Sequence, residues 1–123
     1  MEAHQKIAKA LVNSWQNKDY NLLRDNLADN LKWYENPFDT PLKTADAVLE
    51  QWKRDLAAQS NIEVDVEILA ADAGQGIHRF RVSWTEGEKT QELDGIFLVR
   101  LDARGKIKYF CQWWSAKDRT GNT

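Results

Sequence analysis

Cysteine and proline are nearly missing from this sequence. Its 123 residues include one cysteine, Cys111, and two prolines. A single cysteine excludes a disulfide within the chain and suits a reducing compartment. No apolar run is long enough to cross a membrane, and the charged, amphipathic N-terminal segment has the pattern of a helix and not that of a signal peptide. We therefore expect a cytoplasmic protein.

An excess of basic residues is also lacking. Lysine and arginine number 17 against 19 acidic residues, which gives a net charge of −2, and no run of basic residues occurs. This balance gives no support to binding of a nucleic acid or a membrane. No histidines, cysteines or carboxylates have the spacing of metal ligands, and no glycine-rich phosphate loop is present. We expect no metal and no cofactor.

Length and composition predict a single globular domain over residues 1–123. Hydrophobic residues make up 42% of the chain, which is enough to form a core without disulfides. No linker, repeat or low-complexity segment divides the chain. The one compositional excess is tryptophan, with six residues. Aromatic residues in such number line a core, a ligand pocket or an interface.

Hydrophobic spacing predicts three helices in the first half of the chain. Apolar residues repeat at intervals of three and four over residues 7–15, as expected for one stripe of a helix. Asp19 is suited to cap a short second helix, and Thr44 is suited to cap a third over residues 45–59.

Strands are predicted between these helices and throughout the second half. Residues 31–35 have the composition of a strand, and residues 38–43 that of a loop. From residue 62 onward apolar residues alternate with polar ones, which predicts four strands in an antiparallel meander. The order helix, helix, strand, helix and four strands is typical of an α+β domain whose helices cover one face of a curved sheet.

The last predicted hairpin, residues 91–115, is the centre of this sheet. Both faces of its first strand carry apolar residues, which indicates an interior strand. Trp113 and Trp114 are neighbours in its second strand and must point to opposite faces of the sheet. Asp94 is expected on the outer face, where it can pair with Arg81 of the preceding strand.

Three segments together resemble a known family. They are WYENPF at residues 33–38, the helix that carries Trp52, and the ending from GKI at residues 105–107 to WWS at residues 113–115. In this order they resemble the SnoaL-like branch of the nuclear transport factor 2-like superfamily. The resemblance implies a cone-shaped barrel in which a strongly bent, mainly antiparallel sheet wraps helices at the N-terminal side, with a pocket on its concave face. Members of the superfamily include isomerases, cyclases, epoxide hydrolases, dehydratases and proteins without chemistry, so the fold does not fix a function.

Ketosteroid isomerase is one of these members, and its catalytic residues can be compared with this chain position by position. Its general base is the aspartate of a Glu-Asp-Pro-Phe segment, and this chain has the amide Asn36 at the matching position. The positions that match its oxyanion-hole tyrosine and aspartate are about Leu11 and Phe97. All three chemical groups are absent, so we reject that reaction. Asn36 retains the ability to orient a polar ligand atom.

The concave face is expected to carry most of the aromatic side chains. Two interpretations remain open: a packed aromatic core, and a mostly apolar pocket in which Tyr34, Asn36, His78 and Gln112 are polar anchors. The residues predicted to bind a ligand are Trp15, Tyr34, Asn36, Trp52, His78, Phe80, Trp84, Phe97, Phe110, Gln112 and Trp114.

His78 is the one predicted internal residue with an unperturbed pKa near physiological pH, so an acid–base role is assigned to it. A structural histidine is the alternative, because a catalytic histidine normally has a carboxylate to orient it. Glu35 is the nearest carboxylate in sequence terms, but strand alternation predicts that it points away from Asn36 and out of the pocket. His4 is expected at a mobile end without a role.

The outer face of the sheet is predicted to be apolar as well. Soluble monomers rarely leave such a patch in water, so we expect a two-fold homodimer that packs sheet to sheet. The expected interface residues are Ile96, Leu98, Tyr109, Cys111 and Trp113.

Three functions follow from these predictions. The first is binding of a small, largely apolar molecule in the aromatic pocket. The second is an enzyme of isomerase, cyclase or dehydratase type that uses His78 as its acid–base group. The third is an assembly module in which the outer sheet face is the functional surface. The sequence identifies neither the ligand nor a reaction.

Overall fold

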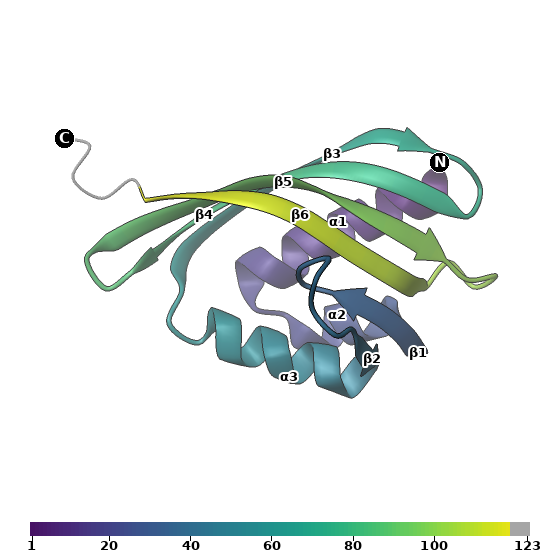
Figure 1. Ribbon diagram of the computed structural model, residues 1–123, viewed down its shortest axis with the longest axis horizontal. Coiled ribbons are helices and arrows are strands. Elements are labelled where there is room, and N and C mark those ends of the chain that lie inside the picture. The colour runs from purple at the N-terminus through teal and green to yellow at the C-terminus, as the bar shows by residue number, and fades with distance from the viewer. Residues whose placement is uncertain (119–123) are drawn as a thin grey trace.

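The computed structural model describes residues 1–118, and residues 119–123 of the predicted domain lie outside the described part. A long curved sheet covers the helices, which lie on its concave side (Figure 1). This arrangement confirms the predicted α+β class. The helices are α1 (Glu2–Asn17), α2 (Tyr20–Asp25) and α3 (Ala45–Leu56), and the strands are β1 (Leu27–Tyr34), β2 (Leu42–Thr44), β3 (Ser60–Ala71), β4 (Gln75–Glu86), β5 (Lys89–Leu101) and β6 (Ile107–Asp118).

The six strands form one sheet in the order β2-β1-β6-β5-β4-β3. Strands β3 to β6 are the predicted antiparallel meander, whereas β1 pairs with β6 in parallel. The short strand β2 pairs with β1, so the prediction of a loop over residues 38–43 was wrong at its end. Three residues after Pro41 are too few to show an alternating pattern. None of the described helices is both long and apolar enough to span a membrane.

The predicted helix caps are present in the structure. The Asp19 carboxylate accepts a hydrogen bond from the Leu22 N–H at 3.1 Å, and the Thr44 hydroxyl accepts one from the Ala47 N–H at 3.1 Å. Each bond satisfies one of the free N–H groups in the first turn of its helix. α2 and α3 therefore begin where the sequence predicts.

The core lies between the concave face of the sheet and the helices. Trp33 is 1% exposed, and its ring stacks on Phe110 at a centroid distance of 3.8 Å. Phe97 is also buried, whereas Ile96 and Trp113 on the other face remain 38% and 44% exposed. The sequence therefore assigned the two faces of the hairpin correctly.

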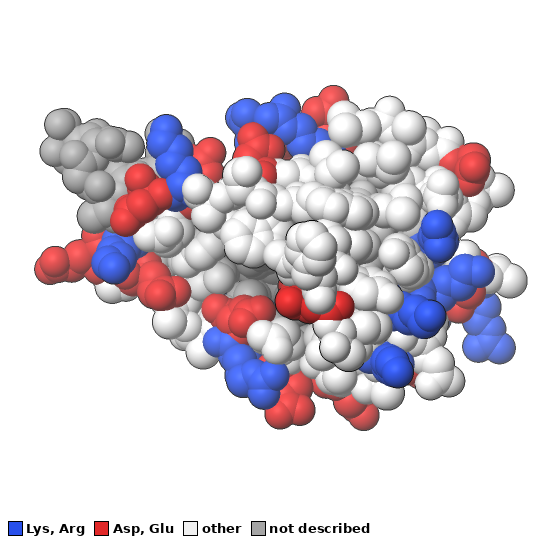
Figure 2. Space-filling model, in the orientation of Figure 1, with Lys and Arg blue, Asp and Glu red and all other residues white. Residues whose placement is uncertain are grey.

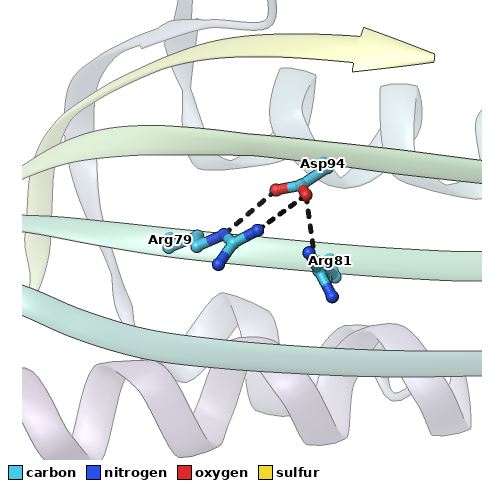
Figure 3. A network of polar contacts seen from close by, with 3 residues as sticks. All are labelled: Arg79, Arg81 and Asp94. Atoms are coloured by element: carbon cyan, nitrogen blue, oxygen red, sulfur yellow. Dashed lines mark hydrogen bonds and ion pairs between the residues drawn. The ribbon is translucent and has the colours of Figure 1, made fainter.

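The outer face carries a small charged network that joins β4 to β5 (Figure 3). Arg79 donates to both carboxylate oxygens of Asp94, at 3.2 and 2.9 Å, and Arg81 Nε donates to one of them at 3.0 Å. The predicted pair of Arg81 and Asp94 is thus confirmed. The hydrogen bond from Arg79 lowers the pKa of Asp94. Because the groups are partly exposed, the network serves to order the outer face more than to stabilise the fold.

Gly95 of β5 lies very close to the backbone of β6. It pairs with Trp114 in the ladder, and a Cβ atom at Gly95 would lie 2.8 Å from the Trp114 Cα and closer still to the Trp113 carbonyl oxygen. These are backbone atoms, which have little freedom to move. The position therefore requires a residue without a side chain.

Candidate functional site

An open cavity of about 520 Å³ lies between the concave face of the sheet and helices α1 and α3. Figure 2 shows a hollow in this side of the molecule with acidic side chains beside it. Most of the cavity wall is aromatic. The aromatic lining residues are Trp15, Trp33, Trp52, Trp84, Trp114, Phe80, Phe97 and Phe110.

The aromatic wall is assembled from elements that are far apart in the chain. Trp15 of α1 and Trp52 of α3 lie with their ring centroids 5.4 Å apart, and Trp15 lies 6.3 Å from Phe80 of β4. The Trp15 N–H donates to the side-chain oxygen of Gln59 at 3.4 Å. Trp114 stands at the edge of the cavity with 44% of its surface exposed. The wall is therefore built by packing of the two helices on the sheet.

Glu35 is the carboxylate that three neighbouring side chains hold in the cavity wall. Its Oε1 accepts a hydrogen bond from Trp33 Nε1 at 3.2 Å, and its Oε2 accepts one from Gln112 Nε2 at 3.1 Å. Its backbone carbonyl accepts a third from Trp114 Nε1 at 3.2 Å. Each carboxylate oxygen has a further lone pair that these bonds leave open. Glu35 is thus fixed in place and retains capacity to accept or donate to a ligand.

The surroundings of Glu35 change its acidity. Burial, together with the negative charges of Asp55 and Asp39, raises its pKa from the ordinary value of 4.5 to about 7. The hydrogen bond from Trp33 acts in the opposite direction. A carboxyl group with this pKa exists in both protonation states near neutral pH, which is the property that acid–base catalysis requires.

The prediction that Glu35 points out of the pocket was wrong. It took Tyr34 and Asn36 as the inward-pointing residues of this strand. Trp33 points inward instead, and alternation then brings Glu35 to the same side as Trp33, whose Nε1 donates to it. β1 ends at Tyr34. Beyond that point the side chain of Asn36 accepts a hydrogen bond from the Phe38 N–H at 3.0 Å, so the chain turns. Both Glu35 and Asn36 therefore reach the cavity. The turn-forming Asn-Pro pair was the signal in the sequence that alternation would stop here.

Most of the residues predicted to bind a ligand come together in the cavity wall. Their side chains arrive from both helices, from the turn after β1 and from the last strands of the sheet. The predicted residues that line the cavity are Trp15, Asn36, Trp52, Phe80, Trp84, Phe97, Phe110, Gln112 and Trp114. Glu35, Asp39 and Asp55 also line it but were absent from the predicted set.

His78 lies outside the cavity lining, although it is on the concave face. It is fully buried, and its ring stacks on Phe97 with the ring centroids 4.8 Å apart. The ring of His4 lies tilted to it at a centroid distance of 5.8 Å. Burial, and then the neighbouring His4, lower the pKa of His78 to about 4. His78 is therefore neutral at physiological pH and has no access to a ligand in this cavity.

His4 does not lie at a mobile end, as the sequence suggested. Its side chain is fully buried, and its Nε2 lies within hydrogen-bonding distance, 2.9 Å, of the Asp72 carbonyl oxygen. Gly76 gives it room, because a Cβ atom there would lie 2.7 Å from His4 Nδ1. The two histidines thus fill space between α1 and β4.

Tyr34 was predicted in the pocket but lies on the outer face. Trp33 points inward, so its neighbour in β1 points outward, where the Tyr34 ring lies 5.7 Å from that of Tyr109. Cys111, the residue opposite Tyr34 in β6, is only 3% exposed even though it faces the same side. Ile77 of β4 extends this outer apolar face, with 38% of its surface exposed.

The sequence places the chain in a family. The model of the SnoaL-like domain matches residues 8–110, which include most of α1, all of α3 and the sheet up to the first part of β6. The protein belongs to the SnoaL-like domain family. No curated protein matches the chain significantly.

Solved structures of several other proteins share this fold. An LEH-like epoxide hydrolase of Mycobacterium tuberculosis is 20% identical and superposes with a TM-score of 0.71, covering 93% of this chain and 83% of that chain. A computationally designed 17-OHP binder is 20% identical with a TM-score of 0.75, covering 89% and 93%. The epoxide hydrolase/cyclase-like enzyme SalBIII, which has a role in pyran ring formation in polyether salinomycin, is 12% identical with a TM-score of 0.79, covering 93% and 91%. These likenesses confirm the cone-shaped fold.

Proposed function

We propose that this SnoaL-like protein binds a small, largely apolar molecule in the aromatic cavity. The observation that carries the proposal is the open space of about 520 Å³ among the aromatic side chains, where a packed core would have none. This volume lies within the range of about 300 to 1,000 Å³ that is typical of ligand pockets. The designed 17-OHP binder supports the proposal, because it is a ligand-binding protein with this fold.

Polar side chains at one end of the cavity supply the anchors for this molecule. Gln112 is oriented by its bond to Glu35, and Asn36 lies beside it in the turn after β1. An apolar pocket with a few fixed polar groups gives orientation as well as affinity.

Adjacent tryptophans provide a matched test of this site. Trp114 lines the cavity and Trp113 does not, yet each is 44% exposed. Calorimetric titration with 4-phenylbutanol should give binding that Trp114→Ala weakens about ten-fold or more, because the probe loses a large aromatic contact. Trp113→Ala should change the affinity less than about two-fold. Equal losses in both variants, or no binding to the unchanged protein, would contradict the proposal.

A second candidate is proton-transfer catalysis on the bound molecule, with Glu35 in place of His78. The specific observation is that Glu35 lines the cavity with a pKa of about 7, whereas His78 lies away from it. Gln112 and Trp33 hold the carboxyl group in one orientation, as a general acid–base requires. The presence of enzymes such as SalBIII in this fold supports the candidate. The reaction would be of isomerase, cyclase or dehydratase type.

We also propose that the outer sheet face joins two copies of the chain in a homodimer. Ile77, Ile96 and Trp113 are each at least 38% exposed there, with the half-buried Leu98 and Tyr109 beside them. Cys111 is buried within one chain, so it lies beneath this surface and makes no contact with the second copy.

Light scattering on a sizing column tests the homodimer. Trp113→Arg should convert the dimer to monomers, because it places a charge in the centre of the apolar contact. Trp114→Arg makes the same chemical change on the opposite face and should leave the dimer intact. A Trp113→Arg protein that remains dimeric would exclude this surface.

A further inference from the structure

The charged residues of the cavity wall all have one sign. Among the described residues that line the cavity, Glu35, Asp39 and Asp55 are acidic, and none is lysine, arginine or histidine. Asp55 comes from α3 and Asp39 from the turn after β1, and both are exposed, so they stand at the rim while Glu35 lies deeper. The negative charges of Asp55 and Asp39 are close enough to add to the effect of burial on the pKa of Glu35. Because none of the lining residues is basic, these carboxylates give this end of the cavity a negative potential.

The aromatic wall favours the same kind of ligand. Five tryptophan side chains contribute to it, and the face of an indole ring attracts a cation more strongly than that of any other side chain. The cavity is thus prepared for a ligand that has a cationic group as well as an apolar body.

An organic cation fits this cavity better than a metal ion does. Within residues 1–118, no group of three or more histidine, cysteine, aspartate or glutamate side chains is placed to hold a metal. The carboxylates are spread along one end of a wide apolar cavity, which suits a bulky ammonium group. Phosphate and carboxylate ligands are disfavoured, because they would meet like charges without a basic partner.

We propose that the ligand of this cavity is an amine: a protonated nitrogen lies beside Glu35 and Asp55, and its apolar body lies against the tryptophan and phenylalanine wall. This inference rests on the proposed binding function and adds the chemical class of the ligand. The ammonium group neutralises part of the negative potential, and the tryptophan faces replace part of its hydration. A neutral analogue of the same shape gains the apolar contacts alone.

Three probes with the same apolar body test the inference by calorimetric titration. They are 4-phenylbutylamine, 4-phenylbutanol and 4-phenylbutyrate. The amine should bind about ten-fold more tightly than the alcohol, and the butyrate about ten-fold more weakly than the alcohol. Glu35→Gln and Asp55→Asn should each reduce the ratio of amine to alcohol affinity by about three-fold or more. Glu63→Gln, which removes the same charge from an exposed position on β3, should leave this ratio unchanged.

The outcomes separate the two proposals. If the alcohol binds as tightly as the amine, the cavity binds apolar molecules but the amine assignment is overturned. If none of the three probes binds, the proposed function itself fails. If the amine is preferred but Glu35→Gln and Asp55→Asn leave its preference unchanged, the cation is held elsewhere and the assignment to this cavity is overturned.

Discussion

Replacing Glu35 by glutamine should make the protein relatively more stable as the pH rises. Folding raises the pKa of this group from 4.5 to about 7, so the folded state keeps a proton that the unfolded state releases in that window. The free energy of unfolding contributed by Glu35 therefore falls as pH increases from 4.5 to 7. The loss reaches about 3 kcal/mol above the window. Glu35→Gln has no proton to release and avoids this loss.

Urea unfolding at several pH values measures the effect as a difference between the variant and the unchanged protein. The difference should grow in favour of Glu35→Gln by about 2 to 3 kcal/mol between about pH 4.5 and pH 8. Asp39, Asp55 and His78 are present in both proteins, so their own contributions largely cancel. A constant difference for Glu35→Gln would show that its pKa is ordinary.

Gly95→Ala should cause the largest loss of stability among single methyl additions to the sheet. The new methyl group would overlap backbone atoms of Trp113 and Trp114, so β6 must move away from β5 and break ladder hydrogen bonds. We expect the free energy of unfolding to fall by about 3 to 5 kcal/mol, in the range of severe core defects. Chemical denaturation followed by tryptophan fluorescence measures this loss.

Gly74→Ala is the matched control for this substitution. No atom lies within 4 Å of the place where its Cβ would be, and its backbone does not have a positive φ. Its effect should stay within about 0.5 kcal/mol. Equal stability of the two variants would mean that β5 and β6 are not as close at Gly95 as the structure shows.

The sequence predicted the sheet well because alternation is a strong constraint on a long strand. Trp113 and Trp114 were assigned to opposite faces from their adjacency alone, and the structure agrees. The same rule placed Phe97 and Phe110 in the core. A shift of one residue would have moved every apolar side chain in β5 and β6 to the wrong face, so the pattern allowed only one assignment of the two faces.

The candidate site was harder to predict because it depends on where strands end and where elements pack. Alternation from Trp33 places Glu35 in the cavity, but the pattern of this short strand does not show that Trp33, and not Tyr34, is its inward residue. His78 does lie on the predicted concave face, but it lies beside His4 of α1 and not in the cavity lining. No periodic pattern tells how far along a face the open space extends, because that depends on the helix that covers each part.

The acidic rim was missed for a similar reason. Asp55 belongs to the polar side of α3 and Asp39 to the loop that the sequence defines least. In the sequence alone, each looks like an ordinary charged residue on the surface. Only the packing of α3 beside the turn after β1 brings them to one cavity.

The indole N–H signals of the six tryptophans provide the most direct measurement of the central claim, that this cavity is a ligand site. In a proton–nitrogen correlation spectrum, 4-phenylbutanol should shift the signals of Trp15, Trp33, Trp52, Trp84 and Trp114, which line the cavity. The Trp84 signal should shift most, since its N–H has no partner among the described residues. Trp113, on the outer face, should stay unchanged. A spectrum in which Trp113 alone shifts, or in which no signal shifts, would contradict the account.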